Sequence, residues 1–294
     1  MRSLMAKPTV FFRLIRFEHT LFALPWALTG ALVAARGLPE ARVFLWILVA
    51  MVGARTAAMS FNRLVDRRFD AANPRTASRP SVTGDIGVGF MAGAVLLSAG
   101  LFFWAAWNLN PLAFALAGPT LAVLLGYSLV KRFWAGSHFV LGVALGLSPL
   151  GAWVAVRGTL EGAWPALALG LAVVAWTTGF DILYACQDEA VDRRLRLHSV
   201  PARCGISGAL WWARISHLFV VPSLLLAGWT ANMGYVFFGA AALVAALLIW
   251  EHRLVHSDDL SQVNRAFFQV NVVIAFVVLL GASLDFWLTA GGAM

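Results

Sequence analysis

Nine runs of mainly apolar residues, each close to twenty residues long, occupy most of the chain. A helix needs about twenty apolar residues to cross a bilayer. With 61% hydrophobic and only 12% charged residues, the chain has too little charged surface for an ordinary soluble protein. We therefore predict an all-α, polytopic membrane protein that forms a single domain over residues 1–294. The predicted spans are 20–36, 42–61, 88–107, 111–130, 137–156, 164–185, 211–231, 234–251 and 267–289.

The basic residues predict how these spans are oriented. With nine alternating spans, 18 of the 22 Lys and Arg residues fall in segments on one side of the membrane. Basic loops stay in the cytoplasm, so we expect a multi-pass protein of the cell inner (cytoplasmic) membrane. Its N-terminus and its Asp-rich loops would be cytoplasmic, and its C-terminus would lie outside. Membrane topology accounts for the net charge of +8, and nucleic acid is not an expected partner.

The end of the second span is unusually rich in charge, in the stretch NRLVDRRFDAANPRTASRP. Asn62, Asp66 and Asp70 follow one another at intervals of four residues, which places them on one face of a helix that continues from the span. Carboxylates so close together need a cation to neutralise them, and carboxylate oxygens at this density suit Mg²⁺ shared with a phosphate-bearing substrate.

A second segment, DILYACQDEAVDRR, repeats this arrangement. Tyr184, Asp188 and Asp192 have the same spacing, and Asp181 lies three residues before Tyr184. Asp188 and Asp192 each follow their counterparts in the first segment by 122 residues. Four predicted spans separate the segments, so both reach the cytoplasmic side. We infer an internal duplication into two pseudo-repeats, each of which contributes one acidic face to a common site.

These residues resemble the motifs of the UbiA superfamily of intramembrane prenyltransferases. The family's first motif and its tail correspond to Asn62, Asp66, Asp70, Arg75, Thr76, Arg79 and Pro80. Its second motif corresponds to Asp181, Tyr184, Asp188 and Asp192, and its Y-x-x-x-K-R element to Tyr127, Lys131 and Arg132. The resemblance implies nine transmembrane helices around a central cavity, in which Mg²⁺ bridges the two acidic motifs and the diphosphate of a polyprenyl donor.

The resemblance also implies a role for each matched residue. The metal ligands would be Asp66, Asp70, Asp188 and Asp192, and the diphosphate clamps would be Arg75, Arg79, Lys131 and Arg132. Asn62 would orient a diphosphate oxygen or a metal-bound water, and Tyr127 belongs to the same substrate-binding set. Tyr184 and Asp181 are candidates for holding the acceptor or assisting its deprotonation.

Arg55 lies inside the second span, seven residues before Asn62 and on the same helix face. A charge at that depth costs at least ~2.5 kcal/mol, so such residues usually face a polar cavity. We expect Arg55 to contact either the diphosphate or a carboxylate of the acceptor.

Two acceptors fit the family's chemistry here, 4-hydroxybenzoate and 1,4-dihydroxy-6-naphthoate, in ubiquinone or menaquinone biosynthesis. The motifs resemble the 4-hydroxybenzoate branch, but the runs HSVPAR and FEHTLFALP resemble the naphthoate enzymes. His198 stands where the 4-hydroxybenzoate branch usually has Lys, and we expect it to belong to the substrate-binding residues. Another acceptor of the family and a non-catalytic membrane transporter are the alternatives. The CDP-alcohol phosphotransferases are disfavoured because their acidic motif contains glycines, whereas only Arg, Arg and Phe separate Asp66 from Asp70.

Overall fold

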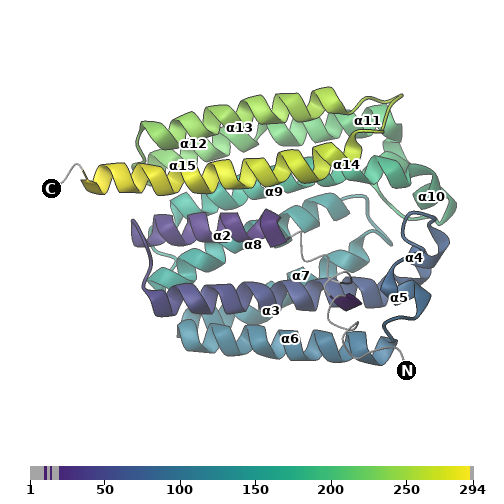
Figure 1. The fold of residues 1–294 in the computed structure, drawn as a ribbon, viewed down its shortest axis with the longest axis horizontal. Helices are drawn as coiled ribbons and strands as arrows, with labels where there is room; N and C mark the ends of the chain where they lie inside the picture. Colours follow the sequence, from purple (N-terminus) through teal and green to yellow (C-terminus); the bar gives the residue numbers. More distant parts are fainter. Residues whose placement is uncertain (1–9, 12–13, 15–19, 292–294) are drawn as a thin grey trace.

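The structure, a computed structural model, describes residues 10–11, 14 and 20–291. Over these residues the regular structure is helical and contains no strand (Figure 1). Eight helices are long and apolar enough to cross a membrane, and one shorter apolar helix covers Phe22–Ala35. The all-α polytopic fold is therefore confirmed. The prediction of nine full-length spans is not confirmed, because the first predicted span corresponds to this shorter helix. The basic residues of the predicted cytoplasmic N-terminus lie outside the described residues.

The long helices run side by side along one axis of the molecule (Figure 1). Short helices follow two of the long ones, at the same end of the bundle. In chain order the elements are α2 (Thr20–Ala35), α3 (Ala41–Val65), α4 (Arg67–Ala72), α5 (Pro80–Thr83), α6 (Val88–Leu109), α7 (Pro111–Val130), α8 (Ser137–Arg157), α9 (Trp164–Ala185), η2 (Cys186–Asp188), α10 (Glu189–Arg194), α11 (Val200–Leu218), α12 (Val220–Thr230), α13 (Tyr235–Leu254), α14 (Val263–Arg265), η3 (Ala266–Val270) and α15 (Asn271–Gly291).

The seventh predicted span is part of a longer helical stretch, which has non-helical backbone angles at Gly205. Helix α11 begins at Val200, and together with α12 it forms an apolar stretch that reaches Thr230. Ser199 starts this helix, because its side chain accepts a hydrogen bond from the Ala202 N–H at 3.3 Å and Pro201 occupies the first turn. The prediction followed the uninterrupted apolar run and missed this capping signal, which lies among polar residues.

Helices α8 and α9 pack closely because glycines line their contact. A Cβ atom on Gly142 would lie 2.6 Å from the Val174 carbonyl oxygen, and one on Gly146 would lie 2.8 Å from the Gly170 carbonyl oxygen. Small residues four apart let two membrane helices approach to backbone contact. This contact fixes the register of α8 against α9, which matters for the functional site.

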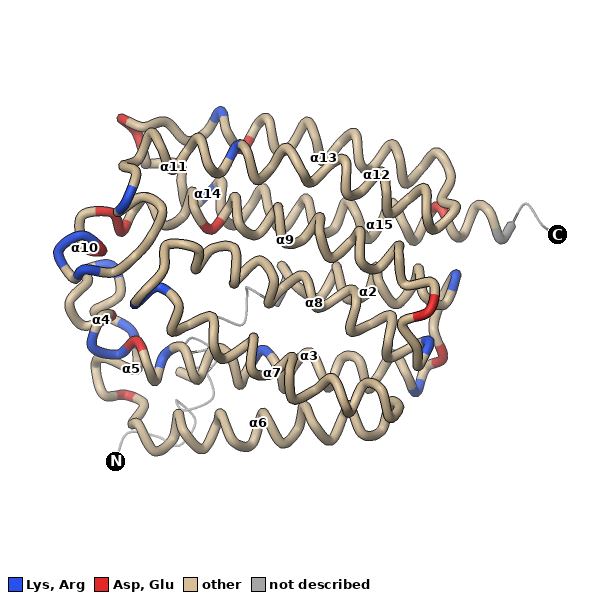
Figure 2. Tube along the Cα trace, turned by 180° about the vertical axis from the view of Figure 1, so that it is seen from behind, with Lys and Arg blue, Asp and Glu red and all other residues tan. Residues whose placement is uncertain are grey.

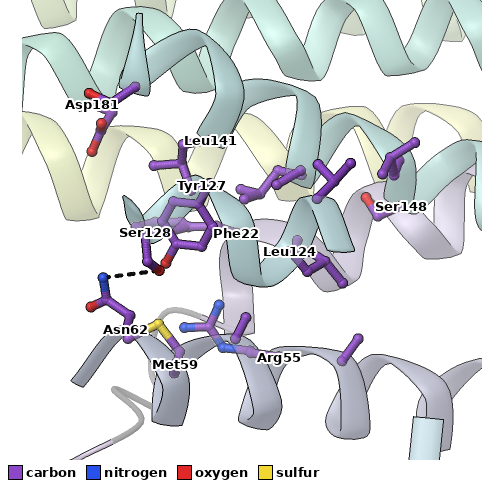
Figure 3. Close-up of a pocket in the computed structure, with 18 of the residues that line it drawn as sticks. Phe22, Arg55, Met59, Asn62, Leu124, Tyr127, Ser128, Leu141, Ser148 and Asp181 are labelled. Atoms are coloured by element: carbon purple, nitrogen blue, oxygen red, sulfur yellow. Dashed lines mark hydrogen bonds between the residues drawn. The ribbon is translucent and has the colours of Figure 1, made fainter. Parts of the chain in front are cut away.

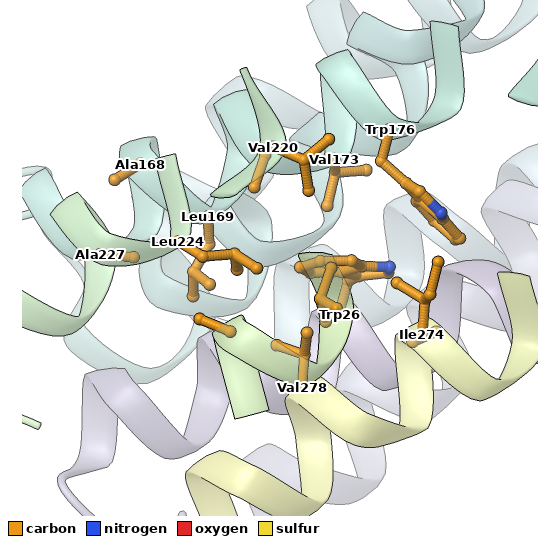
Figure 4. Packing of buried hydrophobic residues seen from close by; sticks show 14 of the residues in the cluster. Trp26, Ala168, Leu169, Val173, Trp176, Val220, Leu224, Ala227, Ile274 and Val278 are labelled. Carbon is orange, nitrogen blue, oxygen red and sulfur yellow. The ribbon is translucent and has the colours of Figure 1, made fainter. Parts of the chain in front are cut away.

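The apolar core lies on the side of α9 that faces α2, α12 and α15 (Figure 4). Trp26 of α2 and Trp176 of α9 are fully buried, with ring centroids 5.4 Å apart. Leu169, Leu224 and Ile274 from three different helices fill the space around them. This packing holds α9 in place, and the last residues of the helix, from Phe180 on, line a cavity.

A buried polar cluster joins α9, α11, α13 and the start of α15. The Asn271 amide donates a hydrogen bond to Glu251 Oε1 at 2.7 Å and accepts one from the Trp176 indole N–H. His217 Nε2 lies 3.1 Å from the Trp176 carbonyl oxygen, and its Nδ1 lies 3.0 Å from His252 Nε2. Because Asn271 and Glu251 are fully buried, water cannot replace these partners.

We expect Asn271→Ala to lower the free energy of unfolding by about 2 kcal/mol or more, because Glu251 and Trp176 would each lose a buried hydrogen-bond partner. Thermal unfolding of the purified protein in detergent measures this loss. Gln269→Ala is the matched control, since Gln269 is exposed two residues away. Equal unfolding temperatures for the two variants would contradict the structural role of Asn271.

Charged residues gather at one end of the bundle. Most Lys and Arg residues lie at the end that carries α4, α5 and α10, together with several Asp and Glu residues (Figure 2). The last turns of α15 lie at the opposite end (Figure 1). The two acidic segments therefore reach the same end of the molecule.

Candidate active site

A cavity of about 670 Å³ is bounded by α2, α3, α6, α7, α8 and α9. Small and branched apolar side chains form most of its walls, among them Ala50, Ala54, Ala117, Leu124, Ala144 and Leu145. At one end the lining becomes polar, where α3 and α9 give way to α4, η2 and α10. The cavity thus joins a long apolar chamber to a charged end, which suits a molecule with a charged head and an apolar tail.

The two acidic segments adopt the same local structure. We predicted that Asn62, Asp66 and Asp70 lie on one continuing helix, but α3 ends at Val65 and Asp66 begins a new short helix, with φ −90° and ψ 2°. Asp188 occupies the same place before α10, with φ −102° and ψ 1°. Helices α4 and α10 both have six residues and are offset by the same 122 positions as the motifs. This local similarity extends the duplication from sequence to backbone conformation.

Each of the four aspartates predicted to bind metal forms an ion pair with one of the four basic residues predicted to bind diphosphate. All eight side chains line the cavity. The pairs are Arg132–Asp66 (3.3 Å), Arg79–Asp70 (2.6 Å), Lys131–Asp192 (2.8 Å) and Arg75–Asp188.

Arg75 connects the two halves of the site. Its Nε donates to Asp188 Oδ1 at 2.9 Å, and its Nη1 donates to the Tyr184 hydroxyl at 2.7 Å. Asn73, which the sequence interpretation did not single out, donates to the same Asp188 oxygen at 2.8 Å. Burial lowers the pKa of the Arg75 guanidinium, but the interactions with Asp188 and Tyr184 outweigh burial and raise this pKa above its ordinary value. The first acidic segment therefore reaches the second through direct hydrogen bonds.

The carboxylates are suited to sharing a cation with a substrate. Burial raises the pKa of the Asp66 carboxyl, and the hydrogen bond from Arg132 only partly offsets this rise. Asp70 Oδ1 accepts from Arg79, while its Oδ2 is buried and accepts no hydrogen bond within the described part of the chain. No three acidic, His or Cys side chains among the described residues converge closely enough to hold a metal alone. Magnesium is typically bound by one or two carboxylates together with substrate phosphates, and this donor set fits that mode.

Asn62 and Arg55 line the cavity from the same face of α3 (Figure 3). Asn62 Nδ2 donates to Asp66 Oδ2 at 2.8 Å and to Ser128 Oγ at 3.3 Å. Arg55 is half-buried and points into the cavity near Tyr127 (Figure 3). The expectation that Arg55 faces a cavity agrees with this position, about 10 Å along the helix from Asn62.

Asp181 and His138 form a second polar group deeper in the cavity. His138 Nδ1 lies 2.6 Å from Asp181 Oδ2, and both residues line the cavity. The sequence interpretation included Asp181 but missed His138, whose only local signal is a histidine at the second position of an apolar span. His198 does not line the cavity: its side chain is exposed, and its main-chain N–H donates to the Lys131 carbonyl oxygen at 2.7 Å.

Comparison with known proteins defines the class. The UbiA prenyltransferase family matches residues 23–284, and the chain belongs to this family. Two relatives are 4-hydroxybenzoate octaprenyltransferases. The enzyme of Nitrosomonas europaea is 30% identical to this chain over 284 residues, which are 93% of each chain. The enzyme of Methylobacillus flagellatus is 30% identical over 283 residues, which are 92% of this chain and 91% of the relative. The predicted family is thereby confirmed, and the transporter alternative is disfavoured.

Solved structures of the family share the fold. A UbiA homologue from Aeropyrum pernix superposes with a TM-score of 0.83 at 30% identity, covering 91% of this chain and 98% of its own. A homologue from Archaeoglobus fulgidus bound to DMAPP and Mg²⁺ superposes with a TM-score of 0.74 at 17% identity, covering 94% of this chain and 99% of its own. The second likeness concerns the fold alone.

Proposed function

We propose that this enzyme transfers a polyprenyl group from an isoprenoid diphosphate to an aromatic hydroxy-carboxylate, either 4-hydroxybenzoate or 1,4-dihydroxy-6-naphthoate, in quinone biosynthesis. The observation that carries the proposal is the set of four carboxylate–base pairs at the charged end of an otherwise apolar cavity. The names of the curated relatives and the ligands of the archaeal homologue support it.

The ion pairs suggest how the donor binds. A metal–diphosphate group contains both the cation that the carboxylates need and the anion that the basic side chains need. Its binding would exchange each pair for a carboxylate–metal contact and a base–phosphate contact. Bound Mg²⁺, held by Asp66, Asp70, Asp188 and Asp192, would neutralise negative charge on the leaving diphosphate.

The basic residues stabilise that leaving group further. When the C–O bond of the donor breaks, the diphosphate leaves with the electron pair, and Arg75, Arg79, Lys131 and Arg132 donate hydrogen bonds to its oxygens. The allylic cation stays in the apolar part of the cavity, away from water. The aromatic ring supplies the electron pair for the new C–C bond, and the ring carbon then loses its proton to a base.

Arg55 and Asp181 are the residues we assign to the acceptor. Both line the cavity, Arg55 from α3 and Asp181 from α9 (Figure 3). The acceptor carries a carboxylate, which a guanidinium binds well in a site of low dielectric. We assign the acceptor carboxylate to Arg55 and the ring proton to Asp181.

An acceptor panel tests the proposed function. The purified protein would be incubated with geranyl diphosphate, Mg²⁺ and each acceptor in turn, and products would be identified by mass spectrometry alongside measured diphosphate release. We expect a prenylated product with one of the two hydroxy-carboxylates. Folded protein that releases diphosphate with neither acceptor would overturn the proposal.

We expect Arg55→Ala to raise the KM for the aromatic acceptor by roughly 10- to 100-fold, while the KM for the donor changes much less, because a charged hydrogen-bond partner of the carboxylate is lost. Steady-state kinetics with each substrate varied separately would show this difference. Arg42→Ala is the control, since Arg42 lies on the same helix but does not line the cavity. A larger effect on the donor KM would assign Arg55 to the diphosphate instead.

The orientation of the protein follows from the same charged end. We propose that the end carrying α4, α5 and α10 faces the cytoplasm, because Lys and Arg concentrate there (Figure 2). The last turns of α15 would then lie near the outer surface. A membrane-impermeant thiol reagent applied to intact cells should leave a cysteine introduced at Arg68 unmodified. Modification of that cysteine would show that the charged end faces outward and would contradict the proposed orientation.

A further inference from the structure

His138 connects three helices at the wall of the cavity. It occupies the first turn of α8 and is 3% exposed. Its Nδ1 lies 2.6 Å from Asp181 Oδ2 on α9, and its Nε2 accepts a hydrogen bond from the main-chain N–H of Val200, the first residue of α11, at 3.4 Å. Each nitrogen of the ring therefore has one defined partner.

These partners determine the tautomer of the ring. The Val200 N–H is a donor, so Nε2 must be the acceptor and Nδ1 must carry the proton. The Nδ1–H then donates to the Asp181 carboxylate. Among the residues that the structure describes, His138 is the only hydrogen-bond partner of that carboxylate, and none of them bonds to Asp181 Oδ1.

The packing of α8 against α9 fixes this contact. Along the antiparallel pair, Gly146 meets Gly170, Gly142 meets Val174 and Thr178, and one turn further on His138 meets Asp181. The glycines leave little freedom to slide, since a Cβ atom at either position on α8 would lie within 2.8 Å of an α9 atom. The carboxylate is thus held by a rigid part of the fold.

The dyad lies apart from the diphosphate end. Asp181 precedes Asp188 by seven residues, which is about 10 Å along a helix. The four basic residues at the charged end pair with other aspartates. The Asp181 side chain is 25% exposed, toward the same cavity that Arg55 lines. A carboxylate that is open to the substrate and held on its other side by a histidine is well placed to accept a proton.

We propose that His138 is a positioning residue for the reaction: its Nδ1–H holds the Asp181 carboxylate so that the other oxygen faces the acceptor ring. This inference rests on the proposed function. In the step concerned, the ring carbon that has formed the new C–C bond loses its proton to Asp181, the C–H electron pair restores the aromatic ring, and the proton later passes to water.

Three substitutions separate this role from simple packing. Asn places an amide N–H close to the position of Nδ1, whereas Gln places its amide close to Nε2. We expect His138→Ala to lower kcat by roughly 10- to 100-fold, with the KM for geranyl diphosphate changed by less than about twofold. His138→Asn should restore most of the activity, and His138→Gln should resemble His138→Ala.

A double-mutant cycle provides the decisive readout. If His138 acts through Asp181, His138→Ala should have no further effect on kcat in an Asp181→Ala background. If the double variant instead loses kcat by the product of the two single effects, the proposal is overturned. Equal kcat values for His138→Asn and His138→Gln would also overturn it. That last comparison still decides the matter if His138→Ala fails to fold.

The controls separate this proposal from the proposed function. His256→Ala is the matched substitution, because His256 is exposed and does not line the cavity, and we expect its kcat to equal that of the wild type. Product formation by the wild type tests the proposed function first. A wild type that prenylates the acceptor while His138→Ala retains full kcat would contradict the role of His138 alone.

Discussion

Replacing Asp188 by Asn is expected to lower kcat/KM for the isoprenoid donor by about 10³-fold or more, because the leaving diphosphate loses the charge stabilisation that this carboxylate provides through a bound cation. Asn has nearly the same shape as Asp and keeps one oxygen that can accept from Arg75 and Asn73, so the fold should persist. Steady-state diphosphate release measures the effect, with thermal unfolding in detergent as the check on folding.

Glu189→Gln is the matched control for Asp188→Asn. Glu189 is the next residue along the chain, does not line the cavity, and pairs with Arg193 on the surface of α10. It loses the same unit of charge at nearly the same place, so an effect of general electrostatics would appear in both variants. We expect wild-type kcat/KM for Glu189→Gln. A similar loss of kcat/KM in both variants would contradict a specific role of Asp188 in the site.

Arg75→Ala is expected to lower kcat/KM for the donor by about 10²- to 10³-fold, the range seen when one donor to a developing anion is removed. Arg75 bonds to both Asp188 and Tyr184, so its loss also leaves a carboxylate with fewer partners. Part of the loss should therefore appear as weaker binding of the donor.

Arg68→Ala provides the comparison for Arg75→Ala. Arg68 is exposed on α4 and does not line the cavity. Both variants lose one positive charge from the same end of the molecule. If long-range attraction of the diphosphate were the main effect, the two variants would lose activity equally, and raising the salt concentration would remove the difference from wild type. We expect Arg68→Ala to differ from wild type by less than about threefold.

The sequence was sufficient to predict most of the charged end of the site. Motif spacing identified the four aspartates, because spacing along a helix survives even where the helix breaks. The four basic residues were identified through the resemblance to the family's motifs. At the break, Asp66 N–H still donates to the Asn62 carbonyl oxygen at 2.9 Å, and the Asp66 carbonyl oxygen accepts from Asp70 N–H at 2.8 Å. The equal spacing of the two segments also predicted that they meet.

Other features depend on contacts that the sequence does not display. The pairing of Arg75 with Asp188 joins residues 113 positions apart, and several basic residues could have filled that place. His138 becomes significant only through the register of α8 on α9, which is set by glycines that look like ordinary small residues in an apolar run. The position of His198 outside the cavity likewise depends on a distant contact, the hydrogen bond from its main-chain N–H to the Lys131 carbonyl oxygen.

The convergence of the two acidic segments on one metal-bound diphosphate can be measured without turnover. Calorimetry with an unreactive thio-analogue of geranyl diphosphate would give its affinity for the wild type, for Asp66→Asn and for Asp188→Asn, each with and without Mg²⁺. We predict tight binding only to the wild type with Mg²⁺, and the same weak binding when either segment is altered or Mg²⁺ is removed. Binding that does not depend on Mg²⁺, or that depends on one segment alone, would contradict a shared site.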